Sequence, residues 1–95
     1  MTKHHSESIA TEQGEFTDEQ KAVLQELIDY CDARGIGYPE SAFKDFLCEM
    51  GITRWLQFLQ PLCTAGLMRR DSANGFRREA VFKPLKKAYV ILKRI

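Results

Sequence analysis

Residue types that support catalysis are scarce in this 95-residue chain. Histidine occurs only at His4 and His5, in a polar leader where we expect an expression remnant or an ordinary tail rather than a metal site. The sequence contains no glycine-rich phosphate loop, and no serine or cysteine stands in a pattern that supplies it with a base. We therefore expect a protein that is not an enzyme and that uses no cofactor.

Cysteine is also sparse. Cys31, Cys48 and Cys63 are odd in number, widely spaced and free of any C-x-x-C pair, which predicts neither a disulfide framework nor a zinc site. Each falls on or beside an apolar helix face, so we interpret them as small core hydrophobes. No apolar run approaches the roughly 20 residues of a spanning helix, and residues 1–15 do not form a secretory signal. We expect no membrane partner and a cytoplasmic location.

What the chain does have is a strong separation of charge. The hydrophobic fraction of 44% and the charged fraction of 28% are those of an ordinary globular protein with a net charge of +1. Residues 1–50, however, carry a net charge of −7, and residues 51–95 carry +8. Such asymmetry indicates a surface that faces a polyanion or an acidic partner, unless the two halves simply attract each other across the fold.

The N-terminal half predicts two helices in one domain, residues 16–95, preceded by a flexible arm over residues 1–15. Thr17 is the expected N-cap of the first helix, with Gln20 completing a capping box, and Gly35 is the expected stop. The apolar stripe of this helix has helical spacing and comprises Leu24, Leu27, Ile28 and Cys31. A second helix is predicted from Pro39 to Gly51, with a buried stripe of Phe43, Phe46, Leu47 and Met50.

A third helix follows almost at once. Ile52 is expected to fill the core, Thr53 to cap the helix and Gly66 to end it. Its predicted core face comprises Trp55, Leu56, Leu59, Leu62 and Cys63. The connection over residues 51–53 has the length and the glycine of the turn in a helix-turn-helix.

The remaining sequence predicts a hairpin and a terminal helix. Asn74-Gly75 is a strong signal for a two-residue turn in which both residues have positive φ. This turn places two opposite-charge pairs and two apolar pairs in register, namely Arg70 with Glu79, Asp71 with Arg78, Met68 with Val81 and Leu67 with Phe82. After Pro84, apolar residues recur at helical spacing as far as Ile95, although residues 89–92 also fit a strand.

This order of elements resembles the winged helix-turn-helix domain over about 80 of the 95 residues. The most specific part is Leu59-x-x-Leu62-x-x-x-Gly66-Leu67-Met68, which is similar to the L-x-x-L-x-x-x-G-L-I segment of bacterial and archaeal winged-helix regulators. Residues 81–88 are similar to the stretch where the second wing strand of those regulators passes into the next helix. The resemblance implies a mainly α fold with a small β-hairpin: a three-helix core, a wing and a C-terminal helix.

The resemblance also implies a function, that of a DNA-binding transcriptional regulator. The third helix would enter the major groove of double-stranded DNA, and the basic wing would bind the backbone. Arg54 would reach guanine, Gln57 adenine and Thr53 a phosphate. The expected DNA contacts are Thr53, Arg54, Gln57, Phe58, Arg69, Arg70, Arg77, Arg78, Lys83, Lys86 and Lys87. A homodimer is expected because one module of this size buries little DNA surface.

Two residues depart from that pattern. Phe58 and Pro61 are predicted in the middle of the outward face of the third helix. Proline removes a backbone hydrogen bond and bends a helix, and an exposed phenylalanine is typical of protein contacts. The alternative is therefore a winged helix used for protein–protein interaction through Phe58 and Pro61. Such a protein could be an adaptor in a larger assembly, or a phage or mobile-element protein that binds a host factor.

Overall fold

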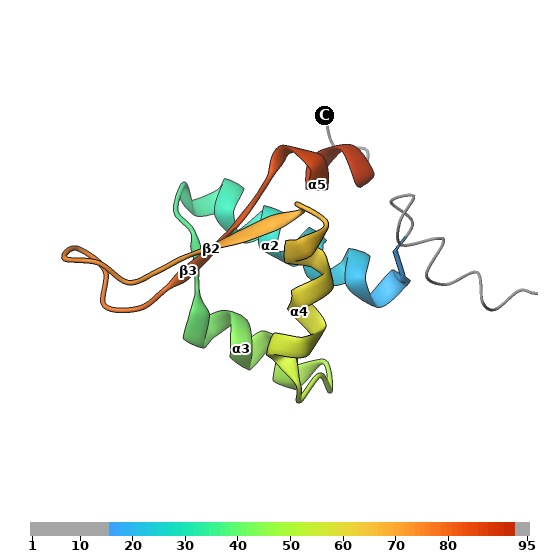
Figure 1. The fold of residues 1–95 in the computed structure, drawn as a ribbon, viewed down its shortest axis with the longest axis horizontal. Coiled ribbons are helices and arrows are strands. Elements are labelled where there is room, and N and C mark those ends of the chain that lie inside the picture. The colour runs from blue at the N-terminus through green and yellow to red at the C-terminus, as the bar shows by residue number, and fades with distance from the viewer. Residues whose placement is uncertain (1–15, 93–95) are drawn as a thin grey trace, which may run out of the picture.

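The computed structural model describes residues 16–92. The expected arm, residues 1–15, and the end of the expected terminal helix, Ile95, lie outside the described residues. The elements are α2 (Asp18–Arg34), β1 (Tyr38–Pro39), α3 (Glu40–Glu49), α4 (Trp55–Thr64), β2 (Met68–Asp71), β3 (Val81–Pro84) and α5 (Lys86–Ile91). The predicted mainly helical fold with a small amount of sheet is confirmed. The sheet, however, has three antiparallel strands in the order β1–β3–β2, so the hairpin of β2 and β3, which Figure 1 labels, has an additional partner.

Helix α2 begins and ends as its sequence predicts. The Thr17 side chain accepts a hydrogen bond from the Gln20 amide at 3.0 Å, and the Gln20 side chain accepts one from the Thr17 amide at 2.9 Å. Gly35 follows the helix in the left-handed conformation, with φ of 69°. Leu24, Leu27 and Ile28 are fully buried, and the helix packs on β3.

The core lies where α2, α3 and α4 meet the sheet. Phe43 of α3 is fully buried, with its ring centre 4.7 Å from that of Tyr38 and 5.2 Å from that of Phe82. The apolar end of the hairpin closes the open side of the three helices. Its buried members are Leu67, Met68, Val81 and Phe82.

The short strand β1 was not predicted. Tyr38 pairs with Phe82 and Pro39 with Val81, and the Glu40 amide donates to the Ala80 carbonyl at 2.9 Å. A Cβ at Gly37 would lie 2.7 Å from Val81 Cγ2, so the approach of β1 to β3 requires glycine at this position. Strand β1 is only two residues long and ends in proline. It is therefore too short to show the alternating polarity by which a strand is recognised in a sequence.

The turn between α3 and α4 is tight. Gly51 has φ of 88°, and Ile52 is buried as expected. Thr53 does not cap α4, which corrects the prediction. The N-cap is Arg54, without a side-chain cap, and its carbonyl accepts the hydrogen bond from Phe58 at 3.0 Å. Thr53 therefore stands one residue too early to reach the free amides of the first turn.

Helix α4 is rotated relative to the prediction. Leu56 was expected in the core and is 58% exposed, whereas Phe58 was expected on the outward face and is half-buried against the core. Leu59 and Leu62 set the centre of the buried face. At 3.6 residues per turn, Leu56 lies about 90° from that centre and Phe58 about 70°. The core therefore takes Phe58, and Leu56 faces solvent.

The hairpin register also differs from the prediction. Met68 lies opposite Pro84, Arg70 opposite Phe82 and Asp71 opposite Val81. The predicted pairs of Arg70 with Glu79 and Asp71 with Arg78 are therefore wrong, as are those of Met68 with Val81 and Leu67 with Phe82. The tip is closed by a bridge between Asn74 and Arg77, so that Gly75 and Phe76 form the turn. Gly75 does not have positive φ, because the Asn74 side chain makes the turn.

The last described element is the helix α5 rather than a strand. Its Ala88 is fully buried.

Cys31 and Cys63 are half-buried, and burial raises the pKa of both thiols. Cys48 is exposed, so its interpretation as a core residue is wrong. Within residues 16–92, no helix has the length and apolarity needed to cross a membrane.

Candidate nucleic-acid interface

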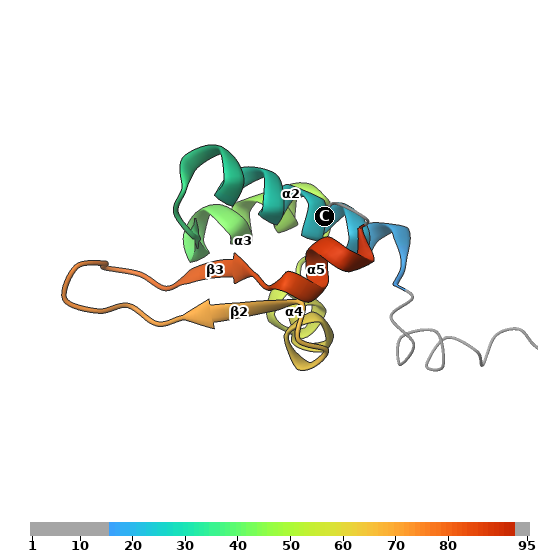
Figure 2. The same ribbon diagram turned by 90° about the horizontal axis from the view of Figure 1, so that it is seen from above.

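The separation of charge along the sequence becomes a separation in space. Residues 16–53, which form α2, β1 and α3, contain eight acidic and three basic side chains. Residues 54–92 contain eight basic and two acidic side chains. In Figure 2 the acidic helices α2 and α3 lie on one side, while β2 and α4 lie on the other. The basic residues of this half are Arg54, which directly precedes α4, and those of the hairpin and α5.

Several of these cations already have acidic partners. Arg70 Nε donates to Glu40 Oε2 at 2.8 Å and Arg70 Nη2 to Glu40 Oε1 at 3.3 Å, so the guanidinium binds the carboxylate with two bonds. The nearby carboxylate raises the pKa of Arg70. This ion pair joins β2 to the first turn of α3, and it lowers the charge that Arg70 offers to another ligand.

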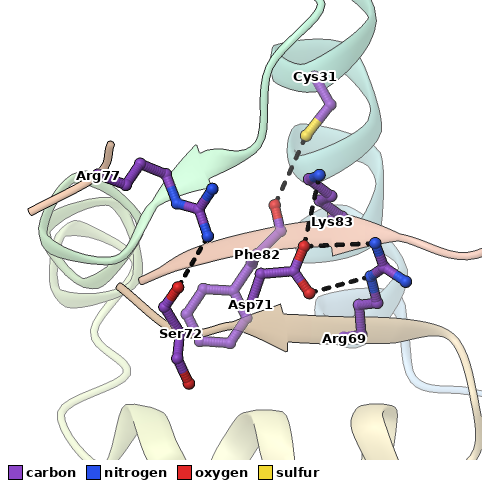
Figure 3. A network of polar contacts seen from close by, with 7 residues as sticks. All are labelled: Cys31, Arg69, Asp71, Ser72, Arg77, Phe82 and Lys83. Carbon is purple, nitrogen blue, oxygen red and sulfur yellow. Dashed lines mark hydrogen bonds and ion pairs between the residues drawn. The ribbon is translucent and has the colours of Figure 1, made fainter. Parts of the chain in front are cut away.

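Asp71 holds two further cations of the hairpin (Figure 3). Arg69 Nε lies 3.1 Å from Asp71 Oδ1, and Lys83 Nζ lies 3.4 Å from Asp71 Oδ2. Alternate residues of a strand share a face, and Lys83 stands opposite Arg69 on β3. One carboxylate therefore serves two cations, and this cluster keeps a net charge of +1.

The hairpin tip is held by side-chain contacts to the backbone. Asn74 Oδ1 accepts from the amides of Phe76 at 2.7 Å and Arg77 at 3.0 Å. Arg77 Nη2 donates to the Ser72 carbonyl at 2.8 Å across the loop (Figure 3). Arg77 Nε is buried without a hydrogen-bond partner. Arg77 thus spans the tip, whereas Arg78 is exposed and makes no polar contact with the rest of residues 16–92.

The acidic residue nearest the tip points back to the body of the protein. Glu79 Oε1 accepts a hydrogen bond from the Ser41 amide at 2.8 Å, at the beginning of α3. This contact lowers the pKa of Glu79. Because its carboxylate is held at α3, it does not pair with Arg70 as the sequence predicted.

On α4 the structure places three of the four predicted contact residues at the surface. Thr53, Arg54 and Gln57 are exposed, and all three line a shallow depression of about 320 Å³ that Leu56 also borders. Phe58 is half-buried against the core, which corrects its predicted place on the outward face, and its expected DNA contact stays a prediction. Pro61, within α4, is exposed as expected.

The two lysines of α5 differ in their surroundings. Lys87 Nζ donates to the Ala65 carbonyl at 3.1 Å, at the end of α4. Lys86 is exposed and has no polar contact within residues 16–92. No carboxylate of the described residues neutralises the exposed predicted contact residues Arg54, Arg78 and Lys86. Arg77 and Lys87 have no carboxylate partner either, but their side chains donate to backbone carbonyls.

A cavity of about 500 Å³ separates the hairpin from residues 35–39. The residues that line it include the cations Arg77, Arg78 and Lys83 and the apolar residues Ile36 and Phe76. Ile36 and Phe76 are 57% and 101% exposed. Neither Phe76 nor Leu56 was predicted at the surface. An aromatic residue directly after Asn74-Gly75 could have signalled the first of them.

Within the described residues, no cluster of histidine, cysteine and acidic side chains could hold a metal ion. No known protein family, curated protein or solved structure matches the chain significantly.

Proposed function

We propose that the protein is a winged-helix protein that binds double-stranded DNA and regulates transcription. The order of the elements supports this fold. Helices α3 and α4 are joined by the tight turn at residues 50–54, and the hairpin of β2 and β3 follows α4 directly. In this proposal, α3 and α4 are the helix-turn-helix and the hairpin is the wing.

The observation that carries the proposal is the concentration of exposed positive charge on the second half of the fold. Arg54 precedes α4, Arg78 stands near the hairpin tip and Lys86 begins α5. Their exposure, without a carboxylate partner in residues 16–92, favours a polyanionic ligand. The acidic α2 and α3 would repel DNA and so orient its approach.

The proposed contacts divide into base and phosphate contacts. Arg54 and Gln57, one turn apart at the start of α4, would read base edges in the major groove. Arg78 and Lys86 would bind phosphates on either side and fix the register. Arg69, Arg70 and Lys83 would contribute less, because Asp71 and Glu40 already neutralise much of their charge.

The test compares single variants in a fluorescence-anisotropy titration with a labelled random-sequence duplex at low salt. We expect Arg78→Ala and Lys86→Ala each to weaken binding and to lower the salt slope by about 1. Lys21→Ala and Lys44→Ala are the matched controls, since both remove exposed lysines from the acidic helices. Equal losses of affinity in both groups of variants would show that binding depends on net charge and not on a defined site. An absence of duplex binding would refute the proposal.

A second candidate is a protein-interaction module, which the 58% exposure of Leu56 favours. With Pro61, Leu56 gives the outward face of α4 an apolar part that base recognition does not require. Leu56 takes over the role that the sequence had assigned to Phe58. If the chain binds no duplex at low salt but forms a dimer that Leu56→Gln dissociates in sedimentation equilibrium, this second function is supported instead.

A dimer is also compatible with DNA binding. Val90 of α5 is 49% exposed, so α5 offers an interface separate from α4. We propose that two copies associate through α5 and leave both α4 helices free. Sedimentation equilibrium of Val90→Lys tests this arrangement: the variant should be monomeric, and an unchanged dimer would exclude α5 as the interface.

A further inference from the structure

Phe76 is the most exposed large apolar residue of the described chain. Its exposed fraction is 101%, compared with 58% for Leu56 and 57% for Ile36. A phenylalanine that contacts nothing in its own fold contributes nothing to folding by burial. Its side chain is therefore available to enter another molecule.

The backbone presents Phe76 in a defined position. Its amide donates to Asn74 Oδ1 at 2.7 Å. On the two sides of the turn, the Asn74 amide donates to the Arg77 carbonyl at 2.9 Å and the Arg77 amide to the Asn74 carbonyl at 3.2 Å. The hairpin that carries the turn projects away from the helices in both views (Figure 1, Figure 2). Phe76 therefore lies at the end of a hairpin whose turn is held by hydrogen bonds.

The surroundings of the ring are positively charged. Arg77 and Arg78 follow it directly, and the next carboxylate, Glu79, is held by the Ser41 amide. The tip therefore combines one apolar ring with two guanidinium groups. A partner that fits it must have an anionic surface with an apolar interior within one side chain's reach. A DNA duplex meets both requirements, because phosphates border the grooves and the base stack lies between them.

We propose that Phe76 is a wedge that enters a base step of duplex DNA from the minor groove, unstacks it and bends the duplex. Arg78 binds a phosphate beside the opened step, while Arg77 keeps the tip in shape through the Ser72 carbonyl. This inference rests on the proposed DNA binding. It adds a preference that α4 does not supply: the opened step should be a flexible pyrimidine–purine step, above all TA.

The experiment uses the full chain and two sets of duplexes. Each duplex has about 30 base pairs, which is long enough to hold one wing site. One set contains TA steps with 2-aminopurine in place of the adenine, and the other replaces each TA by a stiff A-tract. Anisotropy measures affinity, 2-aminopurine fluorescence measures unstacking, and energy transfer between end-attached dyes measures bending. We expect the protein to raise all three signals on the TA duplexes and to bind the A-tract duplexes more weakly.

The variants separate the wedge from the charge. Phe76→Ala should lose the 2-aminopurine and bending signals and should bind TA duplexes about tenfold more weakly, since the buried ring is lost. Phe76→Leu, which keeps an apolar wedge, should retain part of both signals. Ile36→Ala is the control for an exposed apolar residue outside the hairpin, and it should keep both signals in full.

Each outcome decides the matter. Tight binding with no unstacking, or equal unstacking by Phe76→Ala, overturns the wedge and leaves DNA binding intact. If the chain binds no duplex, both the wedge and the proposed function fail. Preference for the single strand in competition would show that Phe76 stacks on unpaired bases, which also overturns the wedge.

Discussion

Arg70 of β2 and Glu40 of α3 form a two-bond ion pair, with Nε and Oε2 2.8 Å apart. The partners are 30 residues apart in the sequence, and both are partly exposed. Because Glu40 neutralises Arg70, this arginine contributes less to the positive charge that the hairpin offers to a ligand. In the proposed complex with DNA, breaking this ion pair should therefore change the affinity without a change in the number of arginines.

Glu40→Gln is expected to raise the affinity for duplex DNA about two- to fivefold, the effect of one exposed ion pair. The substitution frees the Arg70 guanidinium and also removes a negative charge next to it. Anisotropy at low salt measures the change, and Glu49→Gln, at the far end of α3, controls for the loss of one acidic residue. Equal gains for the two variants would show that only net charge matters.

Gly37→Ala is expected to destabilise the fold by about 1–3 kcal/mol, as overpacking does in other cores. The added Cβ would lie 2.8 Å from Val81 Cβ, an atom that cannot move without β3. Gly75→Ala is the matched control, because its Cβ would meet no atom within 4 Å. Urea unfolding should place Gly75→Ala within about 0.5 kcal/mol of the parent. Similar losses for both variants would contradict the close approach of β1 to β3.

Truncation to alanine should affect the free energy of unfolding very differently at two phenylalanines. Phe43 is fully buried and Phe76 fully exposed. Phe43→Ala should cost about 3–5 kcal/mol, a large share of the stability of so small a domain. Phe76→Ala should change the free energy of unfolding by less than about 0.5 kcal/mol. Circular dichroism during thermal unfolding distinguishes them, and a large loss for Phe76→Ala would mean that the hairpin tip packs on the body.

Glu79 is expected to make the stability of the fold sensitive to acid. Its pKa is lowered in the folded state by the hydrogen bonds from Ser41, so the unfolded chain takes up the proton first. The stability that this contact supplies is present above the unfolded pKa, about 4.3, and is lost as the pH falls through the lower folded pKa. Glu79→Gln should therefore lose less stability than the parent between about pH 5 and pH 3. Parallel pH profiles would exclude the Ser41 contact.

The helices could be predicted from the sequence because their signals are local. The capping box of Thr17 and Gln20, the stops at Gly35, Gly51 and Gly66, and the apolar stripes of α2 and α3 are all confirmed. Each depends on residues within one or two turns of one another. Such signals can be recognised in the sequence without knowledge of the rest of the fold.

The errors concern contacts made over long distances in the sequence. Strand β3 pairs with β1 as well as with β2, with Tyr38 opposite Phe82 and Pro39 opposite Val81, and the short β1 gave no signal in the sequence. The rotation of α4 depends on which of Leu56 and Phe58 better fills the space left by the other helices. The partners of Arg70 and Glu79 are Glu40 and Ser41, on an element that no hairpin pattern includes. The candidate surface was predicted in outline, but its free charges were not.

The salt dependence of duplex binding tests the central claim most directly. Arg54, Arg78 and Lys86 are three exposed cations without acidic partners among residues 16–92. If Arg78 and Lys86 bind phosphates as proposed, the logarithm of the association constant should fall linearly with the logarithm of the salt concentration, with a slope of about −2 or steeper. The triple alanine variant should flatten that slope, while Lys21→Ala with Lys44→Ala should preserve it. Binding that is indifferent to salt, or no binding at about 50 mM salt, would contradict the claim.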